Sequence, residues 1–129
     1  MVGICRGAQF LNVMNGGEMY QDVDGHCNGP HTLTDVHNGH QFLVTSTHHQ
    51  MMIPANHGLL VAVANEATYK DYVHQDGEIE RHRDFIGNTD TEVVFYPNTK
   101  SLCFQPHPEM GEGECQDYFF DLLNRYLGV

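Results

Sequence analysis

Basic residues and long apolar runs are both scarce in this chain of 129 residues. Six Lys and Arg stand against 17 Asp and Glu, so the formal net charge at pH 7 is −11. This negative charge argues against nucleic acid or an anionic membrane surface as the main partner, because phosphates would be repelled. No apolar run approaches the ~18 residues that a membrane span requires, and no secretory signal pattern opens the sequence.

Cysteine is present, but it lacks the spacings of a disulfide framework or a zinc site. The four cysteines lie far apart, and no CxxC unit occurs. A reducing, cytoplasmic compartment fits this pattern best. We interpret three of the four as small hydrophobic residues that are buried or half-buried: Cys27, Cys103 and Cys115.

The ten histidines do not have the spacing of a metal site. Most fall in two clusters, His26, His31, His37 and His40 in one segment and the adjacent His48 and His49. Zinc sites use a tight pair, such as two ligands four residues apart on a helix, with matching thiolates or carboxylates. We therefore interpret the histidines as surface or polar-network residues and expect neither a metal nor another cofactor.

Hydrophobic periodicity predicts two helices and a set of strands. Helical spacing over residues 7–14 stops at Asn15-Gly16-Gly17, and an amphipathic pattern over 115–127 predicts a C-terminal helix. Strands are predicted over 41–46, 59–64, 92–96 and 101–105. We expect less regular structure elsewhere: an extended loop over 20–38, a short helical turn over 49–54, and a solvated excursion with at most a short hairpin over 65–90.

Cys5 lies between two glycines, in Gly3-Ile4-Cys5-Arg6-Gly7, and a helical pattern follows it at once. A sharp turn from strand to helix exposes a nucleophile, and its crowded backbone requires small residues two positions on either side. The N-terminal N–H groups of the helix favour the thiolate form of such a cysteine. The pattern therefore predicts a cysteine nucleophile at a strand–helix turn.

A second chemical cluster, His107-Pro108-Glu109, follows the strand predicted over 101–105. A cysteine nucleophile needs a general base, and that base needs an acceptor that fixes its tautomer. Flanking prolines restrict the backbone and help to keep the imidazole aimed. Alone this cluster is a weak signal, but together with Cys5 it predicts His107 as the base and Glu109 as its partner.

Three motifs, in this order, resemble the class I glutamine amidotransferase family: Gly3-Ile4-Cys5-Arg6-Gly7-Ala8-Gln9, Ser46-Thr47-His48-His49-Gln50 and Phe104-Gln105-Pro106-His107-Pro108-Glu109. Within the family, the order and spacing are most similar to the γ-glutamyl hydrolase branch, which includes γ-glutamyl-γ-aminobutyrate hydrolases. The resemblance covers nearly the whole chain, although residues 65–90 match poorly. It implies an α/β, flavodoxin-like amidotransferase fold, of which this chain is the C-terminal portion.

The resemblance also implies roles for individual residues. Cys5 is the nucleophile, His107 the base and acid, and Glu109 its orienting partner in hydrolysis of a glutamine or γ-glutamyl amide through a γ-glutamyl thioester. The Arg6 backbone N–H is an oxyanion donor, while its side chain has either an electrostatic role or a solvated one. The substrate's glutamyl group contacts Gln9, and its α-amino and α-carboxylate groups are held by Ser46, Thr47 and His48.

The sequence departs from the family pattern at its start. In the family a sheet-forming half precedes the cysteine, and a glycine-rich loop in it gives the second oxyanion N–H. Each βα unit takes on the order of 30 residues, yet two residues precede Gly3. We expect residues 1–129 to form a single, incomplete domain that lacks the N-terminal βα units, with an exposed sheet edge and an incomplete active site.

Three functions therefore remain open. The chain could be a stand-alone hydrolase that releases the amine, or a glutaminase subunit that delivers ammonia to a synthetase or ligase partner. It could also be a non-catalytic remnant or binding module, since the oxyanion loop is missing. The oligomeric state, including a homo-oligomer, is equally open.

Overall fold

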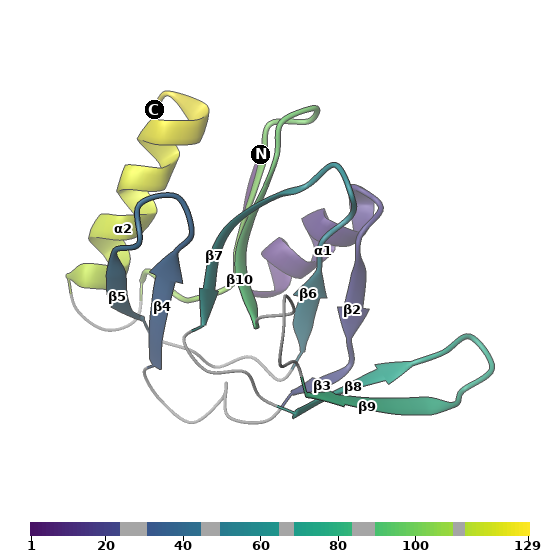
Figure 1. Ribbon diagram of the computed structural model, residues 1–129. Coiled ribbons are helices and arrows are strands. Elements are labelled where there is room, and N and C mark those ends of the chain that lie inside the picture. The colour runs from purple at the N-terminus through teal and green to yellow at the C-terminus, as the bar shows by residue number, and fades with distance from the viewer. Residues whose placement is uncertain (24–30, 45–49, 65–68, 84–89, 110–112) are drawn as a thin grey trace.

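The computed structural model describes residues 1–23, 31–44, 50–64, 69–83, 90–109 and 113–129. Its elements, in chain order, are β1 (Val2–Ile4), α1 (Arg6–Met14), β2 (Glu18–Tyr20), β3 (Asp22–Val23), β4 (His31–Asp35), β5 (Gln41–Val44), β6 (Met51–Ile53), β7 (Leu59–Ala64), β8 (Tyr69–Val73), β9 (Ile79–Arg83), β10 (Thr91–Tyr96), β11 (Ser101–Phe104), α2 (Glu114–Leu122) and the π-helical turn η1 (Leu123–Leu127). The result is an α/β fold, a mixed sheet with two helices (Figure 1). Within these ranges no helix has the length and apolar character needed to cross a membrane.

The main sheet has six strands in the order β1-β11-β10-β7-β4-β5. Strands β1 and β11 are parallel, and the remaining pairs of this sheet are antiparallel. Within the described residues, β1 therefore lies at one edge of this sheet, in agreement with the exposed sheet edge expected from the sequence. Two smaller sheets, β2-β6 and β3-β8-β9, complete the set, and the β8–β9 hairpin projects from the body (Figure 1).

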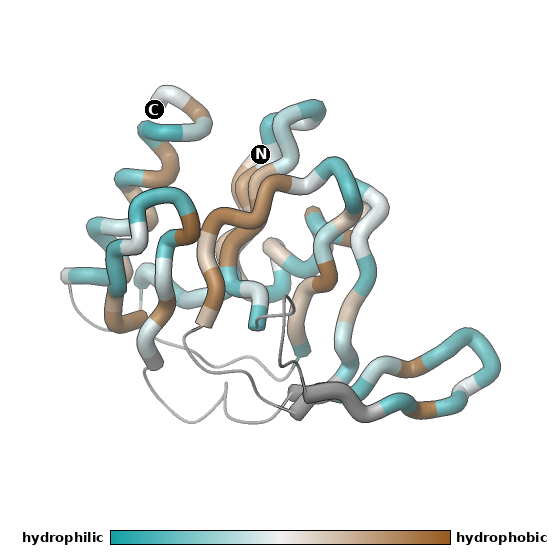
Figure 2. Tube along the Cα trace, viewed as in Figure 1, coloured by the Kyte–Doolittle hydropathy of each residue, from teal (hydrophilic) through white to brown (hydrophobic). Residues whose placement is uncertain are grey.

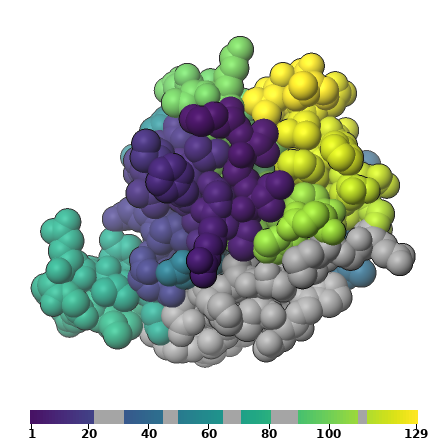
Figure 3. Space-filling model, turned by 180° about the vertical axis from the view of Figure 1, so that it is seen from behind, coloured from purple at the N-terminus to yellow at the C-terminus, as the bar shows by residue number. Residues whose placement is uncertain are grey.

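The central strands are buried on both faces because each lies between the two helices. Every residue of β10 and β11 is buried. Their side chains alternate: Val93 and Phe95 join the cluster that includes α2, whereas Val94 and Tyr96 join the cluster that includes α1. Figure 2 shows these strands as the hydrophobic centre, and Figure 3 shows the face of the molecule on which the N-terminal segment (purple) lies.

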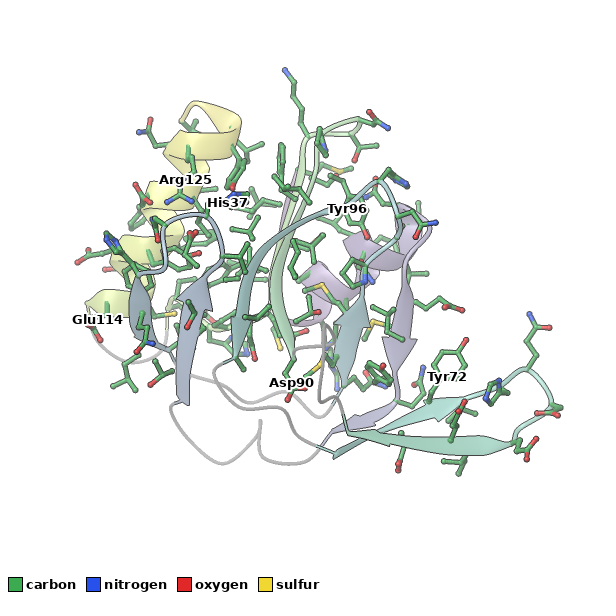
Figure 4. The ribbon with its side chains drawn as sticks, in the orientation of Figure 1. His37, Tyr72, Asp90, Tyr96, Glu114 and Arg125 are labelled. Atoms are coloured by element: carbon green, nitrogen blue, oxygen red, sulfur yellow. The ribbon has the colours of Figure 1, made fainter. Side chains whose placement is uncertain are left out.

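A buried carboxylate joins α2 to the hairpin formed by β4 and β5. Asp35, which is fully buried, accepts hydrogen bonds from the Tyr118 hydroxyl at 2.7 Å and from Nη1 of Arg125 at 2.9 Å. Its other oxygen accepts from the backbone N–H groups of His37 and Asn38. In Figure 4, Arg125 extends from the C-terminal helix towards the turn that carries His37. One oxygen of Asp35 thus joins the hairpin to the C-terminal helix, while the other fixes the turn between β4 and β5.

A buried amide has the corresponding role beneath α1. Asn12, fully buried, donates from Nδ2 to the backbone carbonyls of Glu18 and Ile53 at 2.9 and 3.2 Å. Its Oδ1 accepts from the Tyr96 hydroxyl, and that hydroxyl in turn accepts from the Ala55 N–H at 2.9 Å. The helix is therefore anchored by polar contacts to β2, β6 and β10 as well as by its apolar face.

Most predicted elements are confirmed. Both helices form, and α2 buries the first part of the expected stripe, Cys115, Tyr118, Phe119 and Leu122. The rest of the stripe, Leu123, Tyr126 and Leu127, lies in the π-helical turn η1 and is partly buried against the same cluster. The four predicted strands appear as β5, β7, β10 and β11, and the excursion over 65–90 contains the hairpin β8–β9. Cys103 and Cys115 are buried as predicted, while Cys27 lies outside the described residues.

Two predictions of irregular structure are wrong. The segment 20–38, expected to be an extended loop, contains β4 as an interior strand of the main sheet. The segment 49–54, expected to be a helical turn, contains β6, which pairs with β2. Strand β6 depends on β2, which is distant in sequence. Strand β4 pairs both with its hairpin neighbour β5 and with the more distant β7, and such long-range pairing leaves little local pattern.

Candidate active site

Cys5 occupies the single residue between β1 and α1. Its φ of 54° lies in the left-handed region, which non-glycine residues seldom adopt and which marks local strain. Backbone hydrogen bonds on both sides of Cys5 stabilise this strained conformation. The Cys5 N–H donates to the Phe104 carbonyl at 2.9 Å, and its carbonyl accepts from the Gln9 N–H at 3.1 Å. The sharp turn from strand to helix predicted around this cysteine is therefore present.

The two flanking glycines have different reasons to be small. A Cβ placed on Gly3 would lie 2.3 Å from the carbonyl oxygen of Gly7, a backbone atom that cannot turn away. A Cβ placed on Gly7 would meet nothing within 4 Å. The steric requirement predicted for both positions is thus present at Gly3 and absent at Gly7.

His107 and Glu109 follow β11, the parallel neighbour of β1. Because parallel strands end at the same sheet edge and Ile4 is in register with Phe104, Cys5 and the His107 segment emerge from adjacent strand ends. Nδ1 of His107 is hydrogen-bonded to Oε1 of Glu109, and an ionised carboxylate can only accept. The flanking Pro106 and Pro108 are buried, which fixes the backbone that carries the imidazole.

Electrostatics couple the two halves of this site. Burial raises the pKa of the half-buried Cys5 thiol, and the Glu109 charge adds to the rise. The Arg6 backbone N–H, the Arg6 charge and the Gln105 side chain lower it, but only in part. The thiolate preference expected from the helix terminus is therefore outweighed by burial in this state. Glu109 is exposed. Desolvation opposes the shift, but the hydrogen bond with His107 lowers the pKa of this carboxyl below its ordinary value.

The remaining predicted binding residues are distributed unevenly. Arg6 is exposed beside Cys5. Gln9 is 8% exposed, and its Nε2 donates to the Gln50 carbonyl at 3.3 Å and to Oε1 of Gln105 at 3.2 Å. The Gln9 side chain is thus hydrogen-bonded to protein groups on both sides. Ser46, Thr47 and His48 fall outside the described residues.

Sequence reasoning assigned no role to Gln105, although it belongs to the motif quoted for the family. The structure places it fully buried, with Nε2 directed at the Cys5 sulfur at 3.8 Å. The signal in the sequence was a polar residue that continues a buried strand two positions before His107, where a hydrophobic residue would be the default.

Away from Cys5, the described residues contain a surface pocket but no metal site. Within the described ranges, no group of three or more His, Cys, Asp or Glu side chains is arranged to hold a metal ion. A surface pocket of about 430 Å³ lies between α2 and the β4–β5 hairpin. None of the predicted catalytic residues lines it; the lining consists of Asn38, His40, Phe42, Asp117, Tyr118, Asp121 and Arg125.

Sequence comparison identifies the family to which the chain belongs. The peptidase C26 family model matches residues 1–85, a range that includes Cys5 and Gln9. The chain belongs to the peptidase C26 family. His107 and Glu109 lie beyond the matched range, so their assignment depends on the local motif and the geometry above. No curated protein sequence matches the chain significantly.

Solved structures show the same fold over nearly the whole of this peptidase C26 chain. A glutamine amidotransferase from Thermotoga maritima aligns with a TM-score of 0.60 at 16% identity, covering 98% of this chain and 47% of its own. A protein from Thermoplasma acidophilum, described as part of a putative GMP synthase, aligns with a TM-score of 0.59 at 15% identity, covering 94% and 59%. A glutamine amidotransferase from Methylobacillus flagellatus gives 0.60 at 14% identity, covering 94% and 42%. The chain thus spans about half the length of these structures.

Proposed function

We propose that this chain carries the catalytic residues of a γ-glutamyl amide hydrolase, with Cys5 as nucleophile, His107 as base and acid, and Glu109 as the partner that orients His107. The observation that supports it best is the placement of Cys5 and His107 after two adjacent parallel strands. The strained backbone at Cys5 and the bond between His107 and Glu109 are the local features that this chemistry needs.

The reaction would proceed in two balanced steps. His107 takes the Cys5 proton, the sulfur attacks the γ-carbonyl carbon, and the carbon–nitrogen bond breaks as His107 gives the proton to the leaving amine. Water, deprotonated by His107, then attacks the thioester, which releases the γ-carboxylate and restores the thiol. The Arg6 backbone N–H would donate to the oxyanion that develops in each step.

A second candidate is a glutaminase that supplies ammonia to a synthetase or ligase partner. The specific support is the fold shared with the structure described as part of a putative GMP synthase. Ammonia release measured with and without a candidate synthetase separates the two functions, because strong stimulation by the partner contradicts the stand-alone hydrolase.

Covalent labelling with a chloroketone analogue of glutamine tests the nucleophile directly. We expect Cys5 to react fastest, because Cys103 is buried with its pKa raised to about 12 and Cys115 is 2% exposed. Peptide mass spectrometry identifies the labelled residue, and excess glutamine should protect it. If Cys5 reacts no faster than the other cysteines, the catalytic proposal fails and the chain is a non-catalytic remnant or binding module.

Turnover of γ-glutamyl amides gives the complementary measurement. In any form of the protein that turns over these amides, Cys5→Ala should remove activity entirely, whereas Cys115→Ala, at a core position, should keep it. Equal activity of Cys5→Ala and the wild type would overturn the mechanism.

A further inference from the structure

Gln105 is a buried amide placed directly against the candidate nucleophile. It is fully buried at the end of β11, where its backbone N–H donates to the Glu92 carbonyl at 2.9 Å. Its side chain turns from the strand end to Cys5, with 3.8 Å between Nε2 and Sγ. Burying an amide costs free energy unless its groups find partners. The Cys5 sulfur is the hydrogen-bond acceptor of the Gln105 Nε2 group.

The orientation of this amide is fixed by a chain of hydrogen bonds that starts at the backbone. The Gln50 carbonyl can only accept, so the group of Gln9 that faces it at 3.3 Å must be the NH₂. The second hydrogen of that NH₂ goes to Oε1 of Gln105 at 3.2 Å. Once its oxygen is used in this way, Gln105 presents its NH₂ to the Cys5 sulfur.

We propose that Gln105 is a catalytic hydrogen-bond donor that stabilises the Cys5 thiolate, and that Gln9 is the positioning residue that keeps this amide turned towards the sulfur. The inference deepens the proposed function and rests on it. A thiolate accepts an N–H far better than a neutral thiol or a thioester sulfur does. The contact therefore gains strength when His107 removes the proton from Cys5, and again when the thioester breaks and the sulfur leaves as a thiolate.

Other charged groups also act on the Cys5 sulfur. The Arg6 backbone and guanidinium from α1 favour the thiolate, while Glu109, after β11, opposes it. His107 is the proton acceptor of the proposed reaction. A change at Gln105 or Gln9 leaves these three residues in place, so their influence is the same in every variant compared.

The test is the pH dependence of Cys5 alkylation by iodoacetamide, measured by peptide mass spectrometry on the folded chain without substrate. Gln105→Met keeps the side-chain length and removes the donor. We expect the alkylation midpoint to rise by about half to one pH unit, which corresponds to about threefold to tenfold slower labelling below the midpoint. Gln75→Met, an exposed site in the β8–β9 hairpin, is the matched control and should leave the midpoint unchanged.

Gln9→Met tests the orienting role by a second route, independent of the folding of the Gln105 variant. We expect a smaller shift in the same direction, and the double variant should shift no further than Gln105→Met alone. An unchanged midpoint in both single variants overturns the inference, whatever the turnover results. Retained turnover in Cys5→Ala overturns the proposed function instead, so the two failures are distinguishable.

Discussion

At the scale of single residues, the two glycines beside Cys5 show how far a motif can be interpreted. The motif places small residues at both positions, and the sequence alone offers no way to rank them. The structure ranks them by distance, because the Gly7 carbonyl oxygen approaches Gly3 closely while the space beside Gly7 is open. What the sequence could not contain is the direction in which each missing Cβ would point.

Alanine substitutions at these two glycines test this ranking. Gly3→Ala should lower the free energy of unfolding by about 1–3 kcal/mol, because a Cβ 2.3 Å from a backbone oxygen forces the turn apart. Gly7→Ala, within α1, should be neutral or raise the stability by up to about 1 kcal/mol through helix propensity. Urea denaturation measures both, and equal stabilities for the two variants would contradict the steric account.

The candidate catalytic residues could be proposed from the sequence because the motifs that suggest them are local. Cys5 stands between glycines, and His107 and Glu109 stand two residues apart, so a short motif carries each. Gln105 was not recognised because its role depends on contacts with Gln9 and Cys5, which only the pairing of β1 with β11 brings together.

At the scale of elements, helices were more predictable from the sequence than strands. The C-terminal helix repeats its apolar stripe over several turns, so its signal accumulates. Strand β4 does not, because its buried face contains Leu33 and the carboxylate of Asp35. In the sequence, an Asp at this position favours a loop. Its burial in a strand is explained only by its hydrogen bonds with Tyr118 and Arg125, which lie far along the chain. Strand β6 is too short for any alternation to appear.

Removing the charge of Asp35 should loosen α2 from the β4–β5 hairpin. Asp35→Asn should lower the free energy of unfolding by about 3 kcal/mol at neutral pH, because the partly buried Arg125 and the Tyr118 hydroxyl lose a charged acceptor. Asp121→Asn is the matched control. It removes the exposed partner of the same Arg125 and should cost less than about 0.5 kcal/mol.

The stability difference between the wild type and Asp35→Asn should depend on pH in a definite direction. Although burial opposes it, the hydrogen bonds from Tyr118, the His37 N–H and Arg125 hold the pKa of Asp35 below its ordinary value. The stability from this shift is present above the unfolded pKa of about 3.9 and is lost as the pH falls through the folded pKa. Urea denaturation at neutral and acidic pH should show the difference between wild type and Asp35→Asn shrinking in acid. A constant difference would contradict the assigned cause.

At the scale of the whole molecule, one pair of strands serves two hydrophobic clusters. Strands β10 and β11 contribute alternate side chains to the α1 side and to the α2 side. The site inherits this arrangement, since Cys5 precedes α1 while His107 follows β11. Loss of packing on either face should therefore disturb the same strands, and we expect the two helices to unfold in one cooperative step.

Two neighbouring valines in β10 allow this cooperativity to be tested. Val93→Ala opens a cavity on the α2 side and Val94→Ala on the α1 side, each at a fully buried position. Each should cost about 2 kcal/mol, and each should speed hydrogen exchange of α1 and α2 amides alike, as measured by mass spectrometry. Val73→Ala in the projecting hairpin, where the side chain is 41% exposed, should change neither helix. If each valine affected only the helix on its own side, the two faces would be independent units, and Cys5 and His107 would be held together by β1 and β11 alone.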